Sequence, residues 1–170
     1  AAPATALAVN MHLMCTGVAK ALTDRGDHSL DGVFGEAMAG EIFAFGISEP
    51  SNDWVMQDSK TVAVPQPDGG YLLSGVKIFT SLSPVWTRLI THGRDDTDPE
   101  EPMLVYGFLE RDADGIAVSD QWDVMGMRAS QSRATILTDV RMEPQRVNRR
   151  IAVGRVPDLL TFAITSNFQL

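Results

Sequence analysis

The segment Lys60–Ser81, KTVAVPQPDGGYLLSGVKIFTS, decides the fold of this chain. Two apolar runs, KTVAV and GYLLSG, flank the turn sequence PQPDGG. Because Asp-Gly-Gly readily adopts the positive φ angles of a tight turn, the segment predicts a β-hairpin. Its end places the aromatic Phe79 beside the hydroxyls of Thr80 and Ser81. Such an end indicates either packing and a turn, or a site for a flat ring with polar atoms on its edge.

Outward from the hairpin, the chain continues as short apolar segments separated by turns. The apolar stretch EIFAFGIS precedes it, and four further segments are typical of strands, namely TRLITHG, MLVYGFLE, GIAVSD and RATILTDVRM. This spacing predicts a small β-barrel or sandwich. Helical spacing of apolar residues predicts a helix over residues 5–24, and Ser29 can cap a second helix over 30–40. Pro157 suits the first turn of a last helix that runs to Leu170.

Composition and charge exclude several classes of function. The 170 residues carry a net charge of −8, which disfavours nucleic-acid and anionic-membrane binding. The single cysteine, Cys15, can form no internal disulfide, which favours a reducing, intracellular compartment and hence the cytoplasm. No apolar run is long enough for a membrane span. The chain begins without methionine and stops in apolar sequence, so we expect both ends to be cut from something longer.

Known catalytic and metal-binding patterns are missing from the sequence. His12, His28 and His92 are scattered, and neither a G-x-S-x-G elbow nor a phosphate-binding glycine loop occurs. We therefore expect no metal site and no catalytic residue within this chain. The acidic run from Asp95 to Glu101 is typical of a solvated loop. Taken alone, these patterns predict a soluble α+β fragment with a β-domain.

Three segments, in this order, resemble the acyl-CoA dehydrogenase family. FAFGISEP (43–50) resembles the family's aromatic-x-x-Thr/Ser-Glu-Pro segment, and DGGYLLSGVKIFTS (68–81) resembles a turn and strand that end in Trp-Ile-Thr-Asn. WDVMGMRASQSRATILTDVRMEPQRV (122–147) is similar to the family's Met/Leu-Gly-x-Arg-x-Ser segment. The resemblance implies an α+β fold: helices, a middle β-barrel domain, and the start of a helical bundle. The expected domains are 1–40, 41–150 and 151–170.

The resemblance also implies a cofactor site for FAD. Phe45, Ile47, Ser48, Phe79, Thr80 and Ser81 fall at positions that would contact the isoalloxazine ring. A hydroxyl such as that of Ser81 can donate to flavin N5 when the flavin is oxidised and accept from N5–H when it is reduced. Ser51 and Asn52 stand where the family binds the acyl-CoA thioester arm. The chain departs from the family there, because its loop after Pro50 is shorter.

The implied activity is α,β-dehydrogenation of an acyl-CoA thioester, with the catalytic glutamate lying outside this chain. An electron-transfer flavoprotein or a similar acceptor and a homodimer or homotetramer would be its partners. Two alternatives stay open, since flavin-dependent monooxygenases and nitroalkane oxidases share this architecture. A non-enzymatic assembly module with the same β-domain is the third.

Overall fold

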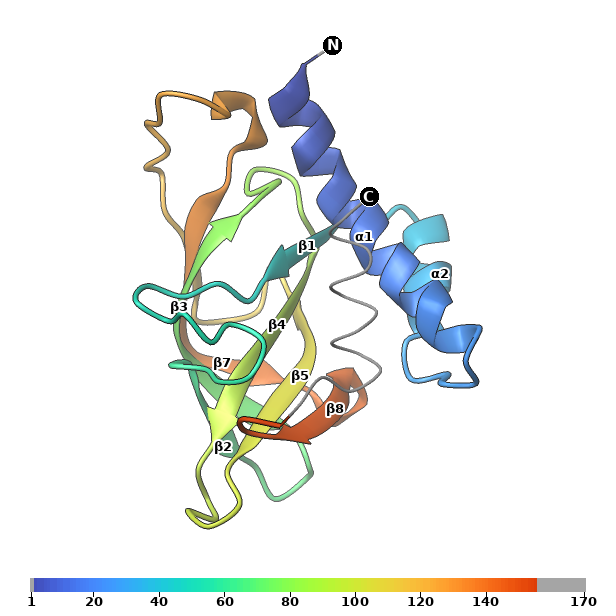
Figure 1. The fold of residues 1–170 in the computed structure, drawn as a ribbon, viewed down its shortest axis with the longest axis vertical. Coiled ribbons are helices and arrows are strands. Elements are labelled where there is room, and N and C mark those ends of the chain that lie inside the picture. The colour runs from blue at the N-terminus through green and yellow to red at the C-terminus, as the bar shows by residue number, and fades with distance from the viewer. Residues whose placement is uncertain (1, 156–170) are drawn as a thin grey trace.

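The computed structural model describes residues 2–155, which form two helices packed against one curled sheet (Figure 1). Two short 3-10 helices interrupt the loops near the end of the chain. The elements in chain order are α1 (Pro3–Thr23), α2 (Gly32–Met38), β1 (Phe43–Gly46), β2 (Val62–Pro65), β3 (Tyr71–Thr80), β4 (Arg88–Asp95), β5 (Met103–Glu110), β6 (Ile116–Val118), η1 (Arg128–Ser130), β7 (Arg133–Met142), η2 (Pro144–Arg146) and β8 (Val147–Ala152).

The first helix follows the sequence prediction closely. Pro3 stands in its first turn, where the missing N–H costs nothing, and Met11, Met14, Val18 and Leu22 are buried on one face. The second helix is shorter than predicted, and the expected cap at Ser29 is wrong. The Ser29 N–H donates to the Asp27 carboxylate, so this short turn competes with the helix, which begins at Gly32.

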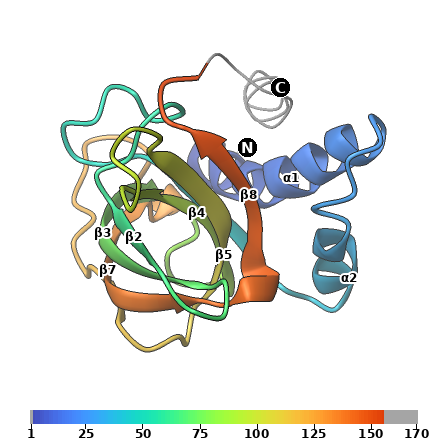
Figure 2. The ribbon, with the colours of Figure 1, turned by 90° about the horizontal axis from the view of Figure 1, so that it is seen from below.

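The sheet is mixed, with the order β6-β7-β3-β2-β4-β5-β8, and β1 pairs with β4. The predicted hairpin is confirmed, because β2 and β3 pair antiparallel with Pro65 opposite Tyr71. The strands β1 and β2 both run parallel to β4. Viewed along its axis, the sheet coils around its own core while α1 and α2 cover one outer side (Figure 2). The α+β class implied by the sequence is confirmed.

Two apolar clusters hold the layers together. One lies between the helices and the sheet and joins α1 to Phe43, Phe45 and Tyr106. The other fills the inside of the sheet around Trp86 and Leu89, both fully buried. Ion pairs also join α2 to the rest of the domain. The Glu36 carboxylate of α2 pairs with Arg88 at the start of β4 and with Arg146 of η2. The helices are thus fixed to the sheet by packing and by charge.

The last described strand was not predicted. β8 pairs antiparallel with β5 and continues to Ala152, two residues beyond the expected domain boundary at 150. The helix predicted from Pro157 lies outside the described residues. Within residues 2–155, no helix is both long and apolar enough to cross a membrane. The same part of the chain holds no group of His, Cys, Asp or Glu side chains suited to a metal ion.

Candidate functional site

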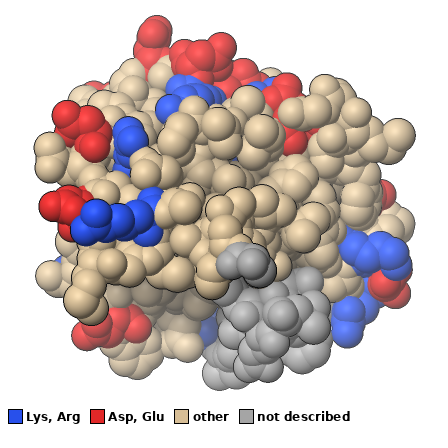
Figure 3. Space-filling view, turned by 90° about the horizontal axis from the view of Figure 1, so that it is seen from above, with Lys and Arg blue, Asp and Glu red and all other residues tan. Residues whose placement is uncertain are grey.

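An open pocket of about 610 Å³ lies where α1, β1, the end of β3 and the loop around η1 meet. No charged side chain of residues 2–155 lines it. The lining consists of apolar side chains and four serines: Leu7, Met11, Phe45, Ile47, Ser48, Val55, Met56, Phe79, Ser81, Trp122, Met127, Ser130 and Ser132. The molecule seen from the end that carries the start of α1 and the η1 loop shows a broad uncharged surface with charges toward its margin (Figure 3).

Phe79 forms one wall of the pocket in a strained conformation. Its φ angle is 59°, in the left-handed region that aromatic residues avoid, and its side chain is 60% exposed. The pairing of β3 with β7 shifts register between Lys77 and Thr80, which turns Phe79 out of the strand. The Ile78 N–H donates to the Ser48 carbonyl at 2.8 Å and joins this wall to the segment after β1. Strain of this kind is typical of functional sites.

Three buried serine hydroxyls form the polar side of the pocket. The Ser132 Oγ lies 2.7 Å from the Ser81 Oγ and 2.7 Å from the Ser130 Oγ. The two loops that carry them are joined by backbone bonds, since the Leu82 N–H donates to the Ser130 carbonyl and the Ser83 N–H to the Gln131 carbonyl. An apolar wall thus faces a short row of hydroxyls.

The structure brings together five of the six residues predicted to contact a cofactor. These five line the pocket: Phe45, Ile47, Ser48, Phe79 and Ser81. Thr80 does not line it. Its side chain is fully buried, and its Oγ1 would lie 3.3 Å from a Cβ at Gly46. The irregularity in β3 between Lys77 and Thr80 therefore turns Phe79 toward the pocket and Thr80 into the sheet.

The two residues predicted to contact substrate lie outside the pocket lining. Ser51 is exposed and adopts a left-handed conformation with a φ of 55°. The Asn52 side chain is engaged within its own loop: its amide donates to the Glu49 carboxylate and the Asp58 carbonyl, and its oxygen accepts from the Trp54 N–H. Asn52 thus shapes the short loop after Pro50.

Sequence reasoning missed part of the pocket. Ser130, Ser132, Trp122 and Met127 come from the segment WDVMGMRASQS, which was recognised as similar to the family but given no site residue. Its Gly-x-Arg-x-Ser pattern was the signal available for Ser130, and Ser132 follows two residues later. Leu7 and Met11 of α1 also line the pocket, although their helical spacing indicated only a packing face.

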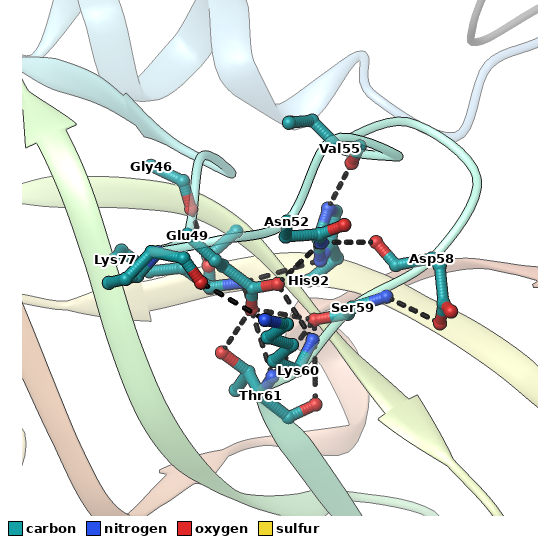
Figure 4. Close-up of polar contacts among 12 residues, drawn as sticks. Gly46, Glu49, Asn52, Val55, Asp58, Ser59, Lys60, Thr61, Lys77 and His92 are labelled. Atoms are coloured by element: carbon teal, nitrogen blue, oxygen red, sulfur yellow. Dashed lines mark hydrogen bonds and ion pairs between the residues drawn. The ribbon is translucent and has the colours of Figure 1, made fainter.

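Behind the pocket wall lies a buried ion pair between Lys77 and Glu49 (Figure 4). The Lys77 Nζ is 2.7 Å from the Glu49 Oε1, and both side chains are almost completely buried. The same carboxylate accepts bonds from Asn52, Ser59, Lys60 and Thr61. Burial alone would raise the pKa of Glu49, but the Lys77 charge and these donors hold that pKa well below its usual range. Glu49 is therefore a structural carboxylate.

His92 extends this network to the loop that lines the pocket. Its Nε2 lies 2.8 Å from the Val55 carbonyl and its Nδ1 lies 3.3 Å from the Lys77 Nζ. Burial, aided by the Lys77 charge, lowers the pKa of His92 to about 3, so the ring is neutral. A neutral ring can donate to Val55 and accept from Lys77 at once. The network thereby fixes the loop whose Val55 and Met56 face the pocket.

Residues 44–140 match the model of the acyl-CoA dehydrogenase middle domain. The chain belongs to the acyl-CoA dehydrogenase family. The recognition made from the three segments is thus confirmed. The matched region includes most of β1, all of β2 to β6, most of β7, and the pocket residues listed above except Leu7 and Met11.

The relatives that the chain matches include a nitrososynthase and a monooxygenase. L-evernosamine nitrososynthase of Micromonospora sp. is 34% identical over 86 residues, which are 51% of this chain and 20% of that protein. Dibenzothiophene monooxygenase of Rhodococcus qingshengii is 32% identical over 101 residues, 59% of this chain and 24% of that one.

A solved structure of FMN-bound TdsC from Paenibacillus sp. A11-2 superimposes on the chain. Its TM-score is 0.61 at 26% identity, over 71% of this chain and 30% of that chain. The chain therefore spans between a fifth and a third of the length of these three relatives.

Proposed function

We propose that the chain supplies the flavin-ring wall of a flavin-dependent oxidoreductase of the monooxygenase type. The observation that carries the proposal is the pocket itself, in which the walls of Phe45, Ile47 and Phe79 face buried serine hydroxyls. A flavin ring is flat and apolar on its faces and carries hydrogen-bonding atoms on its edge. This donor set fits such a ring, and the FMN held by the related TdsC supports the choice.

The residues of this chain would hold and orient the ring. Apolar side chains would pack on its faces and exclude water, while Ser81 and Ser48 would meet its polar edge. Glu49 and Lys77 would keep the two wall segments, 45–48 and 77–81, in register from behind. A bound flavin would supply the redox chemistry and, in a monooxygenase, the reaction with oxygen.

Three features favour a monooxygenase over an acyl-CoA dehydrogenase. The positions expected to hold a thioester arm, Ser51 and Asn52, lie outside the pocket, and the Asn52 side chain is engaged in its own loop. The names of the two relatives at 32–34% identity point the same way. An uncharged pocket suits a neutral, largely apolar substrate better than a charged one.

The experiment uses the protein expressed from its complete reading frame and loaded with FMN or with FAD. Reduced, flavin-loaded protein is mixed with ¹⁸O₂ and dibenzothiophene as the apolar probe. We expect flavin-dependent incorporation of ¹⁸O into the probe. In a parallel anaerobic sample, butanoyl-CoA should leave the absorbance of oxidised flavin unchanged. Bleaching of the flavin by butanoyl-CoA, without ¹⁸O incorporation, would instead establish acyl-CoA dehydrogenation.

A further inference from the structure

The three pocket serines are joined in a row by hydrogen bonds between their hydroxyls. Ser81, Ser130 and Ser132 are between 1% and 5% exposed, and their Oγ atoms are joined through Ser132 by two contacts of 2.7 Å. Within residues 2–155, these hydroxyls have no other side-chain or carbonyl partner. All three also line the pocket in which a ligand would lie.

A row of three hydroxyls has two fully bonded directions. Each hydroxyl has one proton to donate and can also accept. If Ser130 donates to Ser132 and Ser132 to Ser81, the Ser81 proton is free to point into the pocket. If the direction reverses, Ser81 donates to Ser132 and presents only lone pairs to the pocket. The role of Ser81 as donor or acceptor is therefore coupled to the orientation of the two serines behind it.

The backbone around this row is arranged to hold it in place. Leu82, Met127 and Gln131 all adopt left-handed conformations, with φ angles of 65°, 57° and 46°. They stand in the two loops that carry the serines, which backbone hydrogen bonds hold together. Conformations that cost energy at several neighbouring residues indicate that the position of this row matters. Simple packing of small side chains would not require them.

We propose that Ser132, supported by Ser130, is a positioning residue that sets whether Ser81 donates to or accepts from the edge of the bound flavin. The inference rests on the proposed function, since it requires a flavin in the pocket. An oxidised ring offers N5 as an acceptor, and a reduced ring offers N5–H as a donor. Because the row can reverse as a unit, Ser81 can donate to an oxidised flavin or accept from a reduced one. The row therefore affects the ratio of the affinities for oxidised and reduced flavin.

The experiment measures the midpoint potential of FMN bound to the protein expressed from its complete reading frame. Its difference from free FMN gives the ratio of dissociation constants for oxidised and reduced cofactor. We expect Ser132→Ala to change this ratio roughly two- to tenfold, the weight of one neutral hydrogen bond. Ser130→Ala should change it in the same direction and by less, and Ser132→Thr should restore it. The same Ser132→Ala change made in a Ser81→Ala background should have no effect, because the coupling runs through Ser81.

The matched control is Ser83→Ala. Ser83 is a fully buried serine in the same loop, but its hydroxyl donates to the Thr80 carbonyl at 2.6 Å and lies outside the row. It should leave the ratio unchanged. An unchanged ratio in Ser132→Ala, or an equal change in the Ser81→Ala background, would overturn the inference. If Ser132→Ala does not fold, Ser130→Ala carries the same test. Failure of the unaltered protein to bind FMN or FAD would instead overturn the proposed function itself.

Discussion

The two faces at the end of β3 differ in the partners of their polar groups. On the inner side, Lys77 is fully buried and its charge is met by Glu49, whose carboxylate has several further donors. On the outer side, Phe79 is exposed and strained, and Ser81 belongs to a row of hydroxyls open to a pocket. The buried Lys77–Glu49 pair has its partners within the protein, whereas the outer side is suited to receive a ligand. Stability and binding are thus assigned to opposite faces of one strand.

The largest expected effect is a loss of stability when the buried Lys77–Glu49 ion pair on the inner side is broken. Lys77→Met would leave the Glu49 carboxylate buried without its counter-charge, and should lower the free energy of unfolding by about 3–5 kcal/mol. The measurement is urea unfolding followed by circular dichroism. Lys20→Met is the matched control, because the Lys20–Asp24 pair is exposed and should contribute less than about 0.5 kcal/mol. Equal losses in the two variants would contradict the assigned role of the buried pair.

The inner side should also make stability depend on pH. The folded-state pKa of His92 is lowered to about 3, so between pH 6.5 and 3 the unfolded chain binds a proton that the folded chain does not. Stability therefore falls as pH falls through this window, by at most about 1.4 kcal/mol per pH unit from His92. His92→Gln should flatten this slope between pH 6.5 and 5.5, above most of the range in which Glu49 contributes, since its carboxyl in the unfolded chain titrates near 4.5.

The comparison variant for pH is Ser81→Ala on the outer side, whose hydroxyl does not titrate. It should keep the slope of the unaltered protein in the same series of unfolding curves. A slope in His92→Gln as steep as in Ser81→Ala would show that His92 is not the group responsible.

A smaller effect on stability, with a clear effect on binding, is expected at the outer side. Phe79→Ala removes a ring that is 60% exposed, and should change the free energy of unfolding by less than about 1 kcal/mol. The same substitution at Phe43, which is 1% exposed, should cost about 3–5 kcal/mol. Titration with FMN should show at least a tenfold weaker affinity only for Phe79→Ala. If Phe79→Ala unfolds as readily as Phe43→Ala, then Phe79 belongs to the core.

The elements and the family could be predicted because their signals are local. The turn PQPDGG and the alternating apolar runs around it specify the hairpin without any distant contact. β8 escaped prediction because VNRRIA is half-buried and carries two arginines, which leaves no clear apolar alternation. The cap at Ser29 failed because Asp27 offers a competing turn two residues earlier.

The pocket was predicted on one side only, also for a physical reason. Phe45, Ser48 and Phe79 could be predicted because FAFGISEP and DGGYLLSGVKIFTS resemble segments that contact the flavin in the acyl-CoA dehydrogenase family. Ser130 and Ser132 face the pocket because η1 and its left-handed neighbour Gln131 turn the loop, and small hydroxyl residues in a loop have no periodic pattern. The pairing of β3 with β7 brings that loop, which is distant in sequence, next to Ser81.

The measurement that tests the central claim most directly is the visible absorption spectrum of the protein expressed from its complete reading frame, mixed with FMN or FAD and freed of unbound cofactor. We predict flavin bands shifted from those of the free cofactor, and their loss in the Phe79→Ala, Ser81→Ala variant but not in Lys20→Met. A folded, colourless protein, or a double variant with unchanged flavin content and spectrum, would contradict the assignment of this pocket to a flavin.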